Sequence, residues 1–255
     1  MNWIRGFLIG LQFFTAIPIS KSFPIDQAHL KRTIQVFPLI GLFQGMIYSF
    51  LLYKLVEYTP FSHVASAFLL WLATILVTGG IHLDGWIDAS DAYFSYRDRE
   101  KRLEIMKDPR TGAFGVLSII VLLSCRFLFI YEITTYTHLS SFLLIAVIPF
   151  FGKIIMGTVL LTVPSAKQEG LAYLFQQAGT KNSLWIYPLF IVAVLLLFPV
   201  TGWVFCAALC CYVFASWKVK SWFGGITGDI LGATVEGTEL ILWLTVWLWH
   251  YFAMG

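Results

Sequence analysis

The fold class follows from one stretch of the chain, LSSFLLIAVIPFFGKIIMGTVLLTV, which runs from Leu139 to Val163. Its only charged residue is Lys153. A helix that crosses the hydrocarbon core of a bilayer needs about 20 mostly apolar residues. This stretch therefore predicts a transmembrane helix.

Six further apolar stretches predict spans of the same kind. The whole chain of 255 residues is 58% hydrophobic and only 12% charged, which excludes a water-soluble globular domain. We therefore expect an all-α fold, a polytopic integral membrane helical bundle with about seven transmembrane helices. The other six stretches are Val36–Val56, Val64–Gly79, Phe114–Ile133, Leu184–Phe198, Trp203–Trp217 and Thr238–Phe252.

The apolar stretch Ile4–Ile17 is shorter, contains Gly6 and Gly10, and stops at Pro18. It predicts a short re-entrant or interfacial helix. A cleaved signal peptide is the alternative interpretation. We favour mature sequence because no clear small-x-small cleavage site follows and the chain stays apolar afterwards.

The distribution of Lys and Arg predicts the orientation. Fourteen of the 17 fall in loops on one side, whereas the opposite loops 57–63, 134–138 and 199–202 contain none. By the positive-inside rule, the N-terminus and the loop 81–112 are cytoplasmic in a multi-pass protein of the cell membrane. Short loops and the lack of an internal repeat indicate one membrane domain over residues 1–255. A net charge of +3 without a basic run argues against nucleic acid as a partner.

The polar interruption Ile81–Gly112 is the predicted catalytic loop, and it opens with three carboxylates. Asp84, Asp88 and Asp91 are spaced by four and three residues, so a helix would place them on one face. No Lys or Arg occurs between residues 78 and 96 to neutralise them. Three unpaired like charges at this spacing indicate a site for a cation.

Oxygen-only ligands favour a hard ion, Mg²⁺ or its substitute Mn²⁺. The simpler alternative is a solvated helix face at the membrane boundary. His82 precedes the first carboxylate, and the sequence leaves open whether it is a ligand, a general base or a packing residue at a helix end.

A second segment, residues 102–115, carries cations just before a span. Lys107 and Arg110 flank Asp108 and Pro109 in a predicted turn. Cations beside a divalent ion are the groups that hold phosphate oxygens in phosphoryl transfer. Plain positive-inside anchoring is the alternative.

A third polar segment, residues 224–233, places one carboxylate among glycines. A loop of this kind can surround a phosphate with N–H groups of Gly228 or bring Asp229 to the metal. Gly228 and Gly232 could instead serve only helix packing. Glu236 follows at the start of the last span, where a carboxylate is costly and is a functional candidate.

Together these motifs resemble the cobalamin synthase family, the adenosylcobinamide-GDP ribazoletransferases of cobalamin biosynthesis. The pairing of the Asp-rich run with the Met-Lys-Asp run is the most specific part. The matching segments are Phe14–Pro18, Phe37–Gly41, the Gly-Gly-x-His-x-Asp-Gly-x-x-Asp-x-x-Asp run Gly79–Asp91, Ile105–Gly112 with Phe114-Gly115, and Thr227–Ala233.

The resemblance implies a Mg²⁺-dependent transferase embedded in the lipid bilayer. A hydroxyl of alpha-ribazole, or of its 5′-phosphate, would attack adenosylcobinamide-GDP and expel GMP. The pattern is compatible with a single copy and with a homo-oligomer. By matched position, the resemblance assigns metal binding to Asp84, Asp88, Asp91 and Asp229, phosphate binding to Lys107 and Arg110, further substrate contacts to Asp108, Gly228 and Glu236, and the base to His82 or a carboxylate.

Two residues depart from the family pattern. Ala16 stands where the family usually has a basic residue, and Ala92 stands where it has Gly after the last Asp of the run. We expect no basic role at the first position. At the second we expect a looser turn after the metal site.

Two other functions are weighed against this one. A CDP-alcohol phosphotransferase also uses an Asp-rich helix at the membrane boundary, but its Asp spacing differs and its Ala-Arg pair is missing here. A transporter could use Arg126, Lys153 and Glu236, which lie in or near spans. Polar residues gathered at one predicted membrane face argue against transport.

Overall fold

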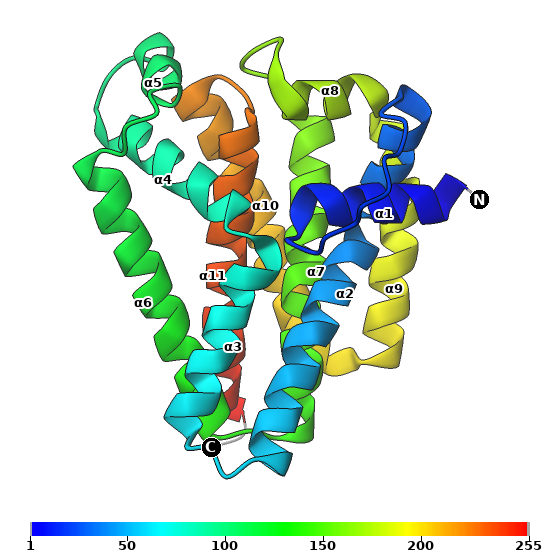
Figure 1. Ribbon diagram of the computed structural model, residues 1–255, viewed down its shortest axis with the longest axis vertical. Helices are drawn as coiled ribbons and strands as arrows, with labels where there is room; N and C mark the ends of the chain where they lie inside the picture. The colour runs from blue at the N-terminus through cyan, green and yellow to red at the C-terminus, as the bar shows by residue number, and fades with distance from the viewer. Residues whose placement is uncertain (1, 254–255) are drawn as a thin grey trace.

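A computed structural model describes residues 2–253 of the chain as a bundle of α-helices (Figure 1). The elements are α1 (Asn2–Phe14), α2 (Gln27–Tyr58), α3 (His63–Thr78), α4 (Ile81–Phe94), α5 (Arg99–Ile105), α6 (Ala113–Thr135), α7 (Leu139–Thr162), α8 (Gly170–Ala178), the 3-10 helix η1 (Lys181–Ile186), α9 (Tyr187–Leu197), the 3-10 helix η2 (Pro199–Thr201), α10 (Gly202–Phe223) and α11 (Gly228–Ala253).

The predicted polytopic helical bundle is confirmed. Within residues 2–253, five helical segments are long and apolar enough to cross a membrane, and counting each of two bent helix pairs as one broken span gives seven. The bent pairs are α3 with α4, at 87°, and α8 with the η1–α9 segment, at 79°. The five segments are Phe37–Tyr58, Ala113–Thr135, Leu139–Thr162, Pro199–Phe223 and Gly228–Phe252.

Helix α7, which contains nearly all of the apolar stretch first considered above, lies at the centre of the bundle. Of its apolar window, 83% is buried by the other helices. Helix α2 approaches α7 very closely at Gly45, where a Cβ would lie 1.9 Å from the carbonyl oxygen of Ala146 in α7. Two helix backbones can meet this closely only where no side chain intervenes.

A sharp bend separates α3 from α4. Gly79 and Gly80 both have left-handed backbones, with φ of 65° and 75°, a conformation that glycine adopts readily. The 87° turn points α4 away from the direction of α3, at the same end of the bundle as α1, α5 and α8 (Figure 1). We therefore treat α4 as a boundary helix outside the five spans.

The short N-terminal helix is present as α1, and it lies across the long helices rather than along them (Figure 1). The chain after it is tied to the end of α3, since the backbone N–H of Ala16 donates to the carbonyl of Val77 at 2.8 Å. Its interfacial or re-entrant position in a membrane stays a prediction.

Two expectations about local structure are wrong. The last span does not begin at Thr238, because α11 begins at Gly228 and takes in most of the predicted glycine-rich loop. Nor does a turn follow Asp91, because Ala92 continues α4 with a fully buried side chain. In both places close packing favours helix where the sequence pattern indicated a loop.

Candidate functional site

Carboxylates from two distant parts of the chain meet where α4 crosses the start of α11. Asp84 and Asp88 lie one turn apart on α4, and Asp229 lies in the first turn of α11. Gly85 permits the crossing, because a Cβ there would lie 2.5 Å from the carbonyl oxygen of Asp229. The structure thus brings together the Asp-rich run and the third polar segment.

Negative charge accumulates at this crossing. Burial, together with the neighbouring charges of Asp84, Asp229 and Asp91, raises the pKa of Asp88 to about 6. Among the described residues no Lys, Arg or His forms a salt bridge with Asp84, Asp88 or Asp229. A hard cation would relieve the repulsion, and the all-oxygen donor set fits such an ion.

Asp91 is directed elsewhere. Its two carboxylate oxygens accept hydrogen bonds from the backbone N–H groups of Gly112 and Gly115, each at 2.7 Å, at the start of α6. Within residues 2–253 no three His, Cys, Asp or Glu side chains already surround one metal position. Metal binding therefore requires the carboxylates to turn toward one another, and the role of Asp91 as a ligand stays a prediction.

A cavity of about 180 Å³ adjoins the carboxylates. Asp84 and Asp229 form part of its wall, as do two other predicted site residues, His82 and Gly228. Aromatic side chains of α1, α2 and α8 supply much of the apolar wall, namely Phe14, Phe37 and Phe175. The cavity thus joins charged and apolar surfaces at one end of the bundle.

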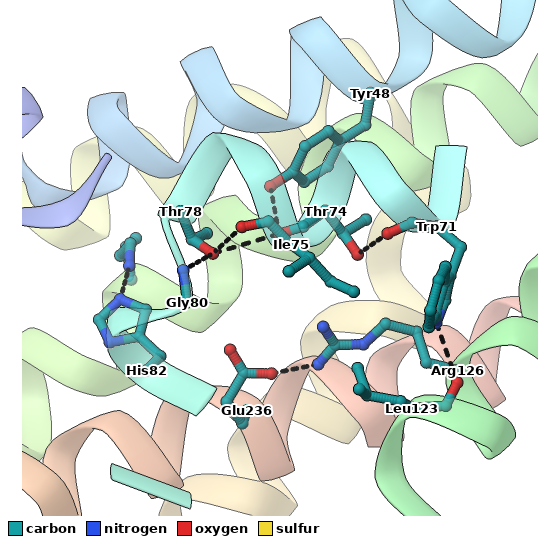
Figure 2. Close-up of polar contacts among 11 residues, drawn as sticks. Tyr48, Trp71, Thr74, Ile75, Thr78, Gly80, His82, Leu123, Arg126 and Glu236 are labelled. Carbon is teal, nitrogen blue, oxygen red and sulfur yellow. Dashed lines mark hydrogen bonds and ion pairs between the residues drawn. The ribbon is translucent and has the colours of Figure 1, made fainter. Parts of the chain in front are cut away.

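His82 is held by a buried lysine. Lys153 of α7 donates to Nε2 of His82 at 2.5 Å, and the imidazole stacks on Phe14 with ring centroids 5.9 Å apart (Figure 2 shows the imidazole and its hydrogen bond). Burial and the charge of Lys153 lower the pKa of His82 well below its ordinary value. The neutral ring therefore carries its proton on Nδ1, which leaves neither nitrogen ready to accept a proton.

The predicted phosphate-binding cations are paired with carboxylates. Lys107 lies 2.5 Å from Glu169, a residue that the sequence did not single out. Arg110 donates to both oxygens of Asp108 at 2.9 and 2.6 Å, and these hydrogen bonds lower the pKa of Asp108 to about 2. Both cations are largely exposed, and the structure does not place them against the acids of α4.

Glu236 lies apart from the other candidates. It forms a buried ion pair with Arg126 of α6, and each residue is at most 2% exposed (Figure 2). Glu239, one turn further along α11, is also buried and packs against Gly152 of α7. These groups belong to the interior of the bundle, and the contact of Glu236 with substrate stays a prediction.

Two features were missed by the sequence analysis. One is an apolar groove of about 630 Å³ between α4, α6, α10 and α11, with Trp86 and Tyr93 on the α4 side. Bulky apolar residues on a membrane helix carry no signal for a groove. The other is Lys167, which the sequence analysis included only among the 14 Lys and Arg residues of the predicted cytoplasmic loops. It lies in the loop between α7 and α8. The polar run 164–169 was its only signal.

The fold and the site together define a class: polytopic membrane proteins with a cluster of carboxylates at one end of the bundle and cations in the adjoining loops. The sequence profile of the cobalamin-5-phosphate synthase family matches residues 6–247. The chain belongs to this family.

Its similarity to curated relatives extends over nearly the full length. A protein from Geobacillus sp. (strain WCH70), described as an adenosylcobinamide-GDP ribazoletransferase, is 39% identical over 268 residues, covering 98% of this chain and 97% of the relative. Proteins of the same description from Geobacillus kaustophilus and Halalkalibacterium halodurans are 40% and 34% identical, covering 98% and 96% of this chain and 98% and 95% of each relative. No solved structure matches. Family membership decides against the CDP-alcohol phosphotransferase and the transporter.

Proposed function

We propose that the chain is an adenosylcobinamide-GDP ribazoletransferase, acting late in cobalamin biosynthesis. A hydroxyl oxygen of alpha-ribazole, or of its 5′-phosphate, attacks the phosphorus on the cobinamide side of the pyrophosphate. The bond from that phosphorus to the GMP oxygen breaks, and GMP leaves. The observation that carries the site is the meeting of Asp84, Asp88 and Asp229 at the crossing of α4 and α11.

Asp84, Asp88 and Asp229 would hold a divalent ion, Mg²⁺ or Mn²⁺. When bound, the ion neutralises charge on the pyrophosphate oxygens. Asp91 holds the start of α6 against α4 through Gly112 and Gly115. A carboxylate of the cluster takes the proton of the attacking hydroxyl, because Nε2 of His82 is engaged by Lys153.

The cations of the loop after α4 would bind phosphate groups. Lys107 and Arg110 are surface side chains, so a phosphate can replace their present carboxylate partners at small cost. The positive-inside pattern supports a cytoplasmic site in the cell membrane. The state of association, one copy or several, does not enter this mechanism.

Purified protein in detergent tests the proposal. We expect GMP release from adenosylcobinamide-GDP that requires both alpha-ribazole and Mg²⁺, and that is lost when EDTA removes the metal. Release without the acceptor would indicate hydrolysis, and full activity in EDTA would exclude the metal.

The variant Asp88→Asn tests the carboxylate site directly. It keeps the size of the side chain but removes the charge, so we expect turnover to fall by about 100-fold. The melting temperature without metal should be no lower than that of the wild type, because the repulsion at Asp88 is gone. Glu57→Gln, an exposed carboxylate at the end of α2, is the matched control and should retain wild-type activity. An active Asp88→Asn protein would remove this residue from the site.

A further inference from the structure

Lys167 lies in a loop that is fixed on both sides. The loop 163–169 joins α7 to α8 and pairs with the segment that leads into α11. Ile226 donates to the carbonyl of Pro164 and accepts from the N–H of Ala166, both at 2.9 Å. The hydroxyl of Ser165 adds a 2.6 Å bond to the carbonyl of Lys167 itself. These bonds hold the backbone of Lys167 beside the start of α11.

The side chain of Lys167 is half-buried between α5 and α11. Its ammonium donates one hydrogen bond, at 2.7 Å, to the carbonyl of Leu103 in α5. Within the part of the chain that the structure describes, no carboxylate lies within salt-bridge distance of it. An ammonium has three N–H donors, so two remain for a ligand.

The charged surroundings of Lys167 connect the two halves of the site. The charges of Asp229, Lys107 and Glu169 all act on it. Burial and the charge of Lys107 lower the pKa of Lys167, whereas the two carboxylates oppose this change. Lys167 is thus held beside the segment that leads to Asp229 and is also within electrostatic range of Lys107 in the loop after α4.

This position distinguishes Lys167 from the two cations that the sequence indicated. Lys107 is paired with Glu169 and Arg110 with Asp108, so each must exchange a carboxylate for a phosphate. Lys167 needs no such exchange, because it forms no salt bridge with a described carboxylate. Its hydrogen bond to the carbonyl of Leu103 fixes the position of the ammonium. We propose that Lys167 binds the pyrophosphate of the nucleotide-activated substrate, and the GMP leaving group, within the proposed transferase site.

The test compares Lys167→Gln and Lys167→Arg with wild type. Lys181→Gln is the matched control, because Lys181 is an exposed cation after the next helix, α8. Loss of one hydrogen bond to a charged group predicts that Lys167→Gln raises the KM for adenosylcobinamide-GDP and the Kd for GMP by about tenfold or more. The KM for the neutral acceptor alpha-ribazole should stay unchanged. Lys167→Arg should recover most of the loss, and Lys181→Gln should match wild type.

Two results would overturn the proposal. One is an unchanged Kd for GMP in Lys167→Gln. The other is an equal loss for both substrates with a lower melting temperature, which would mean that Lys167 only holds Leu103 in place. Because GMP binding is measured at equilibrium on purified protein, it reports on Lys167 even if no transfer is found. Failure of the transferase proposal is thereby distinguishable from failure of this one.

Discussion

At the scale of single residues, Asp88 shows most directly how the carboxylates of the site repel one another. Its pKa rises from an ordinary 3.8 to about 6 because the side chain is partly buried among other carboxylates. Between these two values the folded protein binds more protons than the unfolded chain. Stability attributable to this group therefore increases as the pH falls through 6 toward 4.

We predict a pH dependence from this shift. In EDTA, lowering the pH from about 7.5 to about 5.5 should raise the melting temperature of the wild type relative to Asp88→Asn, which has no carboxylate to protonate. Mg²⁺ should reverse the trend, since it binds the ionised form. Thermal unfolding followed by circular dichroism gives both curves. If the melting temperatures of the two proteins change with pH in the same way, the raised pKa does not belong to Asp88.

At the scale of elements, the site depends on how closely α4 approaches α11. Gly85 and Gly232 both lie at this contact, and a Cβ on Gly232 would lie 3.2 Å from the Cα of His82. Gly85 is the tighter position, since its Cβ would lie 2.5 Å from the nearest backbone atom of Asp229, compared with 3.2 Å from His82 at Gly232. Backbone can relieve such overlap only if one helix moves.

We therefore predict that Gly85→Ala separates the carboxylates. The added methyl group should cost about 1–3 kcal/mol of stability and should lower transfer activity further than stability explains. Gly202→Ala, where a Cβ would meet nothing within 4 Å, is the matched control. Activity and the midpoint of unfolding measured on both variants decide the point. Wild-type activity in Gly85→Ala would show that α4 and α11 can move apart at this crossing without loss of the site.

The sequence predicted the elements to different degrees, for physical reasons. Apolar windows located α2, α6, α7 and α10 well, because the bilayer sets a minimum apolar length. The early start of α11 was missed because glycines and Asp229 read as loop. At Gly232 the close contact with the backbone of α4 favours glycine, and residue spacing does not show that contact. The Asp spacing of four and three did predict a shared helix face, since helical periodicity is a local property.

The site was predictable only as far as its residues belong to short local motifs. The pairing of Lys107 with Glu169 and the position of Lys167 depend on loops that are far apart in the chain. His82 was an ambiguous candidate because the sequence could not show that Lys153, 71 residues later, donates to it. Long-range hydrogen bonds of this kind have no counterpart in residue spacing.

At the scale of the whole molecule, four buried Arg, Lys and Glu side chains of the described residues balance one another inside the bundle. Arg126 of α6 and Lys153 of α7 are positive, and Glu236 and Glu239 of α11 are negative. The four act on one another electrostatically. An isolated charge in this environment would be very costly, so these residues join α6, α7 and α11 into one unit.

A double-mutant cycle on Arg126 and Glu236 tests this interpretation and, with it, the predicted contact of Glu236 with substrate. Arg126→Met or Glu236→Gln alone leaves an unbalanced buried charge, which should cost about 3–5 kcal/mol in unfolding from detergent. The double variant keeps the interior neutral, because Lys153 and Glu239 still balance, and should recover much of that loss.

The activity of the double variant separates the two roles of Glu236. If Glu236 acts only through Arg126, the double variant should release GMP at close to the wild-type rate, since neither residue lines the cavity beside Asp84 and Asp229. If Glu236 binds substrate, the double variant should stay folded and lose activity, with a raised KM for one substrate. Because the ion pair lies within the bundle and the carboxylates lie at its end, we expect the first outcome: stability and catalysis depend on separate sets of charges in this chain.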